Sequence, residues 1–451
     1  MFLTVVYFIV ALLILITVHE YGHFLVARLC GVKVLRFSFG FGKVLAKWHD
    51  KHGTEFVWSL LPLGGYVKML DESEEEVPKE ERHLAFNNKS ILARTAIVAA
   101  GPVFNFLFAF LALWLVLIIG IYSLAPIIDT VTPGSPAALA GIQAQEEIVA
   151  FDDTPIKSWR DFQYALMPLI ASDESINLSL KTLKTGEQRT VILPLSGWKF
   201  DSKNPDLLAG LGIVPFIPKI PPKVGEVMPG SPAQKSGLEK GDFIKEFNGK
   251  PLDDWLTLVD YVLKNPNKSI TLNVLRGKVI LPFKLTIGNV EKDGHSSGFI
   301  GVRSEKVEWP KQLLRYEHES PLKAIGTSFT QTVTLIKATF SLMTRFFTGK
   351  LDLQNVSGPV GIAQGAGESG RGGFTYYLSF LALVSISLGV LNLLPIPMLD
   401  GGHLLYYLIE FIRGQPLSEQ AKSVGFSIGL VLLLALMCLG LSNDISRLLL
   451  K

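Results

Sequence analysis

The chain has 451 residues, which is too many for one ordinary domain. Hydrophobic residues make up 48% of it and charged residues only 18%, and this balance, with a mean hydropathy of +0.35, favours a membrane protein over a soluble one. The net charge of +3 is too small to indicate nucleic-acid binding, and the two cysteines, Cys30 and Cys438, lie too far apart in apolar sequence to indicate a disulfide framework or a thiolate zinc site.

Residues 1–27 predict a first membrane-spanning helix, because Met1–Val18 carries no charge and about 20 apolar residues cross a bilayer. We expect a retained anchor, since the basic start and the cleavage site of a signal peptide are missing. Near its end the helix reads His-Glu-Tyr-Gly-His, so His19 and His23 share one face and can hold one metal ion. Glu20 is then placed to take a proton from an attacking water. Such side chains are costly inside a membrane and usually functional.

Residues 28–94 carry an excess of Lys and Arg, which predicts a loop on the cytoplasmic side. Within the loop, residues 55–67 have the pattern of a strand, a turn and another strand. A β-hairpin can dip into the membrane only where protein covers its backbone or where it borders a wet cavity, and an ordinary cytoplasmic hairpin is the alternative. The acidic stretch Asp71–Arg82 predicts a solvated, mobile linker.

A second span is predicted over residues 95–124, which are free of charge. It contains Gly101-Pro102, which indicates a kink or close helix packing. Asn105 either lines an active site or hydrogen-bonds a neighbouring helix, and the sequence favours neither.

An internal repeat follows, because Val131–Ala137 returns as Val227–Ala233 at an offset of 96 residues. The pattern resembles a tandem of PDZ domains of the circularly permuted bacterial kind, over residues 125–218 and 219–305. PDZ domains bind extended peptides by strand addition, and a pair of spacers is the alternative.

The two copies differ at one turn. Gln145-Glu146 stands in the first copy where Gly241-Asp242 stands in the second, which makes the ligand groove of the first copy the less certain one.

Residues 306–373 predict an amphipathic helix and a linker. Eight apolar residues recur at helical spacing from Leu322 to Phe347, which indicates a helix lying on the membrane surface, with a helix packed on the PDZ pair as the alternative. Gly358–Gly373 is rich in glycine, and we expect it to be flexible. Further spans are predicted over residues 374–403 and 423–443.

The third predicted span carries a candidate third metal ligand. By alternation of the spans, Asp400 falls on the same side of the membrane as the two histidines. Two His and one carboxylate leave a fourth tetrahedral position for water, which is typical of catalytic zinc. His403 is a rival ligand, but we expect it to begin the next segment beyond a Gly-Gly turn. A non-enzymatic scaffold and a metal transporter are competing functions, and the intact Glu20 argues against both.

The motifs His-Glu-Tyr-Gly-His and Asn-x-x-Pro-x-Pro-x-Leu-Asp-Gly, with two PDZ-like repeats between them, resemble the site-2 protease family over nearly the whole chain. The resemblance implies a polytopic α-helical membrane protein with about four transmembrane helices and two inserted periplasmic PDZ (α+β) domains, placed in a bacterial inner membrane. It implies an intramembrane zinc metalloprotease in which His19, His23 and Asp400 bind zinc, Glu20 is the general base, and Asn392 contacts substrate or helps to hold the site. The implied substrates are an anti-sigma factor after a first cut, and remnant signal peptides.

A substrate helix hides its peptide bonds in internal hydrogen bonds, so it must unwind before it is cut. The freed backbone groups then need partners in the membrane, and an open strand edge offers them. We expect the hairpin to provide that edge through Phe56, Val57, Trp58, Ser59 and Leu60.

Overall fold

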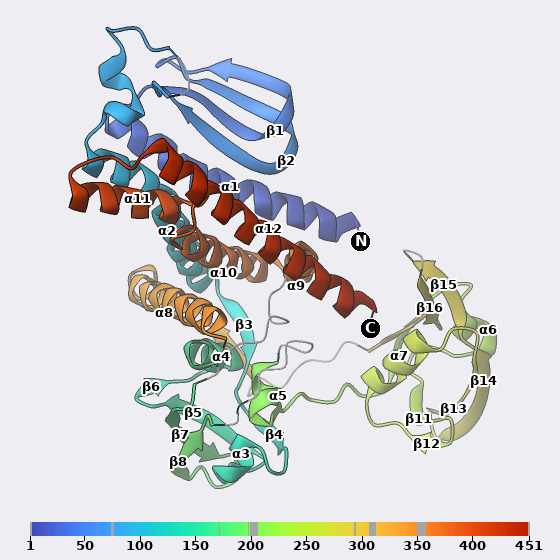
Figure 1. Ribbon diagram of the computed structural model, residues 1–451. Helices are drawn as coiled ribbons and strands as arrows, with labels where there is room; N and C mark the ends of the chain where they lie inside the picture. The colour runs from blue at the N-terminus through green and yellow to red at the C-terminus, as the bar shows by residue number, and fades with distance from the viewer. Residues whose placement is uncertain are drawn as a thin grey trace. The chain divides into compact units, whose positions relative to one another are not determined.

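The computed structural model describes residues 2–73, 76–170, 172–196, 198, 206–292, 295–305, 313–349 and 358–449. The chain divides into two compact units (Figure 1). The first unit joins Met1–Val214 to Arg315–Lys451, and the second is Pro215–Leu314.

Four described helices are long and apolar enough to cross a membrane, as the sequence predicts: α1 (Phe2–Leu29), α2 (Ile91–Ile119), α10 (Phe374–Asn392) and α12 (Glu419–Leu449). The third span is shorter than predicted. It ends at Asn392, and α11 (Asp400–Arg413) starts a new helix after Pro395 and Pro397, which cannot donate a backbone N–H to a continuing helix.

The core of the helical part lies where α1, α2 and α10 meet. Leu15, Leu113, Leu381 and Ile386 are buried together there. Gly22 allows α1 and α2 to lie close together, because a Cβ added at this position would lie 2.5 Å from the carbonyl oxygen of Ala100. The first helix is thus held against α2 along the turn that carries the two histidines.

The loop after α1 forms a bent sheet from β1 (Val34–His49) and β2 (Glu55–Met69). Each strand bends in its middle into two limbs: 34–39 and 44–49 in β1, and 55–59 and 65–69 in β2. The 36–39 limb pairs with 55–58 on one side and with 65–68 on the other, and the 55–59 limb also pairs with 44–49. The limbs of β2 therefore do not pair with each other as a hairpin, and the outer limbs of the sheet are 44–49 and 65–69.

The acidic stretch that follows is not the freely solvated linker that its composition predicts, at least in its described part. Val77 is buried with Leu70 and Ala85, and the Lys33 ammonium lies 2.6 Å from the Glu81 carboxylate. Two short 3₁₀ helices, η1 (Arg82–Leu84) and η2 (Phe86–Asn88), complete the segment. Residues 74 and 75 lie outside the described part of the chain.

The two repeats fold alike, each around a four-stranded antiparallel sheet. The strand order is β6-β5-β7-β8 in the first copy and β12-β11-β13-β14 in the second. The first copy contains β4 (Ile128–Val131), α3 (Pro136–Leu139), β5 (Glu146–Phe151), β6 (Thr154–Pro155), α4 (Trp159–Leu166), η3 (Met167–Leu169), β7 (Ser175–Thr182), β8 (Gln188–Pro194), α5 (Leu207–Leu211) and β9 (Ile213–Pro215). The second contains β10 (Val224–Val227), α6 (Pro232–Ser236), β11 (Phe243–Phe247), β12 (Lys250–Pro251), α7 (Trp255–Lys264), β13 (Ser269–Arg276), β14 (Val279–Thr286), β15 (Gly288–Lys292), β16 (His295–Phe299) and β17 (Val302–Ser304).

The turn at which the copies differ in sequence has the same architecture in both. Gln145 adopts a φ of +63°, in the left-handed region that Gly241 also occupies at +95°. The residue after it is a buried acid in each copy: Glu146 pairs with Arg189, and Asp242 pairs with Arg276. Each arginine also donates to a carbonyl of the preceding turn. The departure of the first copy from the second is thus structurally conservative.

The chain leaves α2 and returns toward the helices side by side, because β3 (Ile121–Leu124) pairs with β18 (Leu314–Glu317). Helix α8 (Pro321–Phe347) follows. It buries small and polar residues, among them Ala324 and Ser328, and leaves Leu322 84% and Phe329 63% exposed. The first half of its apolar stripe therefore faces outward, which favours the predicted contact with lipid over packing of that half on the PDZ pair.

The glycine-rich stretch expected to be flexible is a helix, α9 (Pro359–Gly372). Its glycines permit close packing on α1, since a Cβ added at Gly367 or Gly370 would lie 2.7 Å from Thr4 or 2.6 Å from Tyr7. Asp444 of α12 caps the first turn of α9 by accepting hydrogen bonds from backbone N–H groups. The flexibility prediction was wrong because glycine in a membrane helix also serves close helix contact.

Candidate active site

The histidines of α1 and the acid at the start of α11 meet at one point. His19 Nε2 lies 3.3 Å from His23 Nε2, and Asp400 Oδ2 lies 3.2 Å from the first and 3.5 Å from the second. The three side chains are largely buried, with exposures of 12% for each histidine and 17% for Asp400. Residues 19 and 400 are thus brought together by the packing of the helices, as the alternation of the spans predicts.

The donor set fits a bound cation. One ligand atom from each of His19, His23 and Asp400 lies within 4.8 Å of the others, and Asp400 Oδ2 is buried without a hydrogen-bond donor. Buried acceptor atoms without a donor are rare and costly in proteins, and a metal ion satisfies all three at once. Two imidazoles and one carboxylate are a zinc ligand set that leaves a tetrahedral position open.

Helix α2 holds both imidazoles from one face. The Ile97 carbonyl lies 2.9 Å from His23 Nδ1, and the Asn105 amide lies 3.0 Å from His19 Nδ1. Between them Gly101 leaves room for the rings, because an added Cβ would lie 2.4 Å from His23 Nε2 and 2.6 Å from His19 Cε1. Such outer contacts fix the tautomer and direction of metal-binding imidazoles.

Asn105 contacts both a neighbouring helix and the site, but only the contact with the site uses its side chain. Its backbone carbonyl accepts a hydrogen bond from Ser385 of α10, which ties two helices together. Its side chain contacts His19, and a metal at His19 Nε2 leaves the hydrogen on Nδ1. The amide oxygen is the acceptor for that hydrogen, so we assign Oδ1, which otherwise has no partner, to face the ring.

Glu20 lies on the side of the cluster that borders the sheet. It lines a cavity of about 620 Å³ together with His23 and Asp400. One wall of this cavity is the outer limb of β2, residues 65–69, which is called the open limb below and contributes Tyr66, Val67 and Met69. A Cβ added at Gly65 would lie 3.3 Å from Glu20 Cγ, so the strand and the carboxylate are in direct contact. Glu20, the candidate ligands His23 and Asp400, and the outer limb of β2 therefore line the same cavity.

The rival ligand His403 lines the same cavity but lies outside the metal cluster of the described residues. The expected Gly-Gly turn before it is absent, since Gly401 and Gly402 belong to the first turn of α11. These glycines let the helix start close to the preceding turn, because an added Cβ would lie 2.2 Å from the Leu394 carbonyl oxygen at Gly401 and 2.5 Å from that of Ile396 at Gly402. His403 is thus one helical turn beyond Asp400.

Three of the five residues predicted to bind substrate lie in a limb that is paired on both sides. Phe56, Val57 and Trp58 pair with limbs on both sides, and Ser59 is buried with its hydroxyl 3.5 Å from that of Ser38. Leu60 follows this inner limb of β2 and is 55% exposed. Their role in substrate binding stays a prediction, but the edge on which it relied is formed by residues 65–69, which the 55–67 pattern alone did not separate from the inner limb.

Asn392 ends α10, and its side-chain amide donates to the Leu388 carbonyl 3.1 Å away. It lies outside the cavity lining around Glu20. Its predicted contact with substrate stays a prediction.

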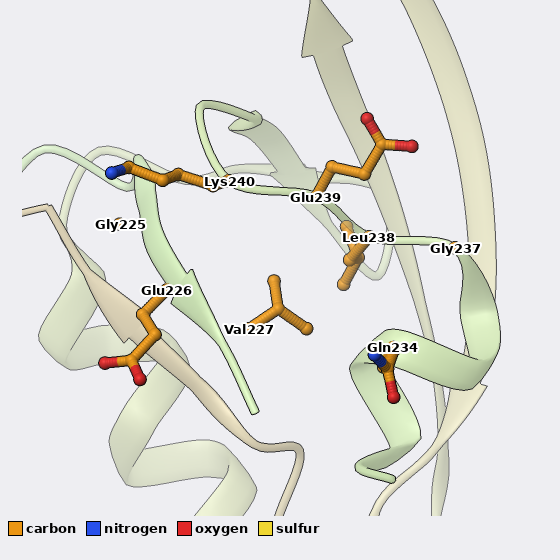
Figure 2. A pocket seen from close by; sticks show the side chains of 8 residues that line it. All are labelled: Gly225, Glu226, Val227, Gln234, Gly237, Leu238, Glu239 and Lys240. Atoms are coloured by element: carbon orange, nitrogen blue, oxygen red, sulfur yellow. The ribbon is translucent and has the colours of Figure 1, made fainter. Parts of the chain in front are cut away.

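A second cavity, of about 730 Å³, lies in the second unit (Figure 2). Val227 and Leu238 lie near its middle, whereas the charged ends of Glu226, Glu239 and Lys240 point in different directions. These groups do not converge on a point, so the chemistry of the chain is placed at α1 and α11.

Comparison with known proteins identifies the family of the chain. The model of peptidase family M50 matches residues 7–436. The chain is 45% identical over 441 residues to the regulator of sigma-E protease RseP of Escherichia coli K12, and 45% identical over 444 residues to the protease RseP of Yersinia pestis, covering 98% of this chain and of each relative. A relative from Vibrio cholerae, 39% identical over 98% of both chains, carries zinc metalloprotease in its name.

Among solved structures, a PDZ domain of an SdrC-like protein from Listeria monocytogenes is similar to 20% of this chain and 92% of its own, at 20% identity and a TM-score of 0.18. The family match spans residues 7–436, and the relatives cover 98% of the chain. The chain therefore belongs to peptidase family M50, the site-2 protease family, and is a zinc metalloprotease of the membrane.

Proposed function

We propose that this intramembrane protease holds its zinc ion through His19, His23 and Asp400 and uses Glu20 as the general base. The observation that carries the proposal is the meeting of three ligand atoms within 4.8 Å beside an acid that lines the same cavity. A structural metal site closes all four tetrahedral positions with protein ligands, whereas three ligands leave room for water and substrate.

The roles divide as follows. Zinc, when bound, polarises the scissile carbonyl and acidifies a water molecule. Glu20 accepts the proton of the attacking water and passes it to the leaving nitrogen of the peptide. The Ile97 carbonyl and the Asn105 amide keep the two imidazoles directed at one point. Burial of the cluster keeps competing water away from the charged groups, which strengthens their interactions.

We propose that the open limb of β2, residues 65–69, binds the unwound substrate as an added strand. Among the described strands, the 36–39 limb pairs with residues 65–68. The Val67 backbone hydrogen-bonds Glu20, and the limb borders the cavity that holds this carboxylate. Each unpaired backbone group in lipid costs several kcal/mol. An added strand at this edge supplies hydrogen bonds to the substrate and sets the scissile bond beside the ligand cluster.

The substrates we propose are single-pass membrane proteins in a bacterial inner membrane: an anti-sigma factor after a first cut, and remnant signal peptides. The relatives named as regulators of sigma-E support the first of these. The Lys and Arg excess of residues 28–94 supports a cytoplasmic location for the β1–β2 sheet, and the alternation of the spans supports a periplasmic location for both PDZ-like repeats.

We propose that the PDZ-like pair keeps substrates with bulky periplasmic domains out. The pair is inserted between strands β3 and β18, which lie next to each other, so residues 127–305 can be removed without parting these strands. The deletion should permit cleavage of untrimmed substrates. A folded, zinc-loaded deletion variant that cuts nothing would favour a recruiting role for the repeats instead.

The test of the proposed function is cleavage of a model transmembrane peptide by purified protein in detergent, with and without a chelator. Glu20→Gln should abolish cleavage and leave the zinc content at one per chain, because the ligands remain while the proton acceptor is lost. Full turnover by Glu20→Gln would overturn the assignment of the base. A scaffold would bind metal or peptide without cleavage, and a transporter would move metal without it.

A further inference from the structure

Helix α11 presents more than Asp400 to the rest of the site. Asp400, His403, Tyr407 and Glu410 recur at spacings of three, four and three residues, so they share one face of the helix. Asp400 lies at one end of this face, against the histidines. Glu410 lies ten residues on, which is about 15 Å along a helix.

Helix α2 carries a matching face. Arg94, Ile97, Gly101 and Asn105 recur at spacings of three, four and four residues, and the last three contact the two histidines. Arg94 is thus one turn before the first of these contacts. The same helix that directs both imidazoles therefore also carries a cation at its beginning.

An ion pair between Arg94 and Glu410 joins the face of α2 to the face of α11. Arg94 donates to both oxygens of Glu410, from Nη2 at 2.7 Å and from Nη1 at 3.2 Å, and each side chain is only 15% exposed. The guanidinium also lies 5.0 Å from the centre of the Tyr407 ring and donates to the Lys89 carbonyl at 3.2 Å. A largely buried ion pair joined by two hydrogen bonds has one preferred geometry, unlike an exposed ion pair.

We propose that Arg94 and Glu410 are positioning residues that set the distance of Asp400 from the two histidines before zinc binds. The inference rests on the ligand role proposed for Asp400. Helix α11 packs against α2, with the turn before it close at one end and the Arg94–Glu410 ion pair at the other. Loss of the ion pair allows α11 to change its angle to α2. The free energy needed to order Asp400 then reduces the affinity for zinc.

The test measures zinc affinity by competition with a chromophoric chelator in detergent. Arg94→Glu and Glu410→Arg each place like charges together, and each should weaken zinc binding roughly tenfold, the size of effect seen for residues outside a ligand shell. The double variant Arg94→Glu/Glu410→Arg restores opposite charges and should recover most of the loss. Arg94→Lys keeps the charge but not the two-bonded geometry, so its affinity should fall between those of the wild type and Arg94→Glu.

The matched control is the ion pair of Arg160 with Glu317, which is buried to a similar extent, with exposures of 17% and 10%, and touches neither α11 nor the histidines. Arg160→Glu should lower the unfolding temperature and leave zinc affinity unchanged. Equal weakening of zinc binding by Arg94→Glu and Arg160→Glu, or wild-type affinity in Arg94→Glu, would overturn the inference. Should the charge reversals not fold, Glu410→Gln and Arg94→Lys carry the same comparison.

The outcome separates this inference from the proposed function. Zinc retained by Asp400→Ala would mean that the ligand assignment itself is wrong. Zinc lost by Asp400→Ala but kept by the charge reversals would leave the ligands in place and remove only the positioning role of Arg94 and Glu410.

Discussion

Replacement of Gly101 by alanine tests the whole arrangement of the site with one carbon atom. The new Cβ would lie 2.4 Å from His23 Nε2 and 2.6 Å from His19 Cε1. Non-bonded atoms of this size prefer about 3.5 Å, so one of the groups has to move by about 1 Å. Because Gly101 faces both rings at the point where they turn toward Asp400, the displacement falls on the ligand cluster.

The expected loss follows from this displacement. Active-site groups work within about 0.5 Å of their productive positions, and a misplacement of about 1 Å can lower a rate about 100-fold. Overpacking should also lower the free energy of unfolding by about 1–3 kcal/mol. We therefore expect Gly101→Ala to cut a model transmembrane peptide about 100-fold more slowly, with weaker zinc binding by chelator competition.

The matched control is Gly326→Ala in α8, where an added Cβ meets no atom within 4 Å. There alanine should stabilise the helix by about 1 kcal/mol and leave cleavage unchanged, because it removes only backbone freedom. Wild-type zinc affinity and rate in Gly101→Ala would refute the close contact between α2 and the histidines on which the site depends.

The remaining predictions concern the third ligand, the open strand limb and the second repeat. Asp400→Ala should lose zinc and activity together, while His403→Ala should keep the zinc; the opposite pattern in metal analysis would make His403 the ligand. Val67→Pro should slow cleavage about tenfold at full zinc content, because proline lacks the backbone N–H that Val67 directs at Glu20 on the open limb. Leu45→Pro, on the opposite outer limb, is the control. Equal cleavage rates in the two variants would rule out strand addition at residues 65–69. Burial works to raise the pKa of Asp242, but the hydrogen bonds from Arg276 outweigh it and hold this pKa below its ordinary value. The folded repeat therefore binds the proton less readily than the unfolded chain, so the pair stabilises it above about pH 4 and this contribution is lost as the pH falls further. The protection factors for amide hydrogen exchange in the second repeat, which divide out the intrinsic exchange rate at each pH, should fall more steeply on acidification in the wild type than in Asp242→Asn.

The sequence by itself determined the chemistry of the site and the plan of the chain. Two histidines four residues apart with a glutamate between them share one helix face in any helix, so this part of the site follows from local geometry. Long apolar stretches without charge have no stable place in water, so the four candidate spans could be predicted from composition. The repeat is visible because matching residues recur at one offset.

The tertiary structure decided what depends on contacts between distant segments. The sequence favours Asp400 over His403 as the third ligand, but the packing of the start of α11 on the turn before it decides that Asp400 lies at the histidines. Strand pairing is likewise non-local: the pattern of residues 55–67 indicates two limbs, but which limb is open depends on β1, which lies between them. The glycines of α9 were expected to give flexibility, and Gly101 of α2 indicated a kink or close packing. The structure shows close contact in both helices, because the effect of a missing side chain depends on the neighbouring helix.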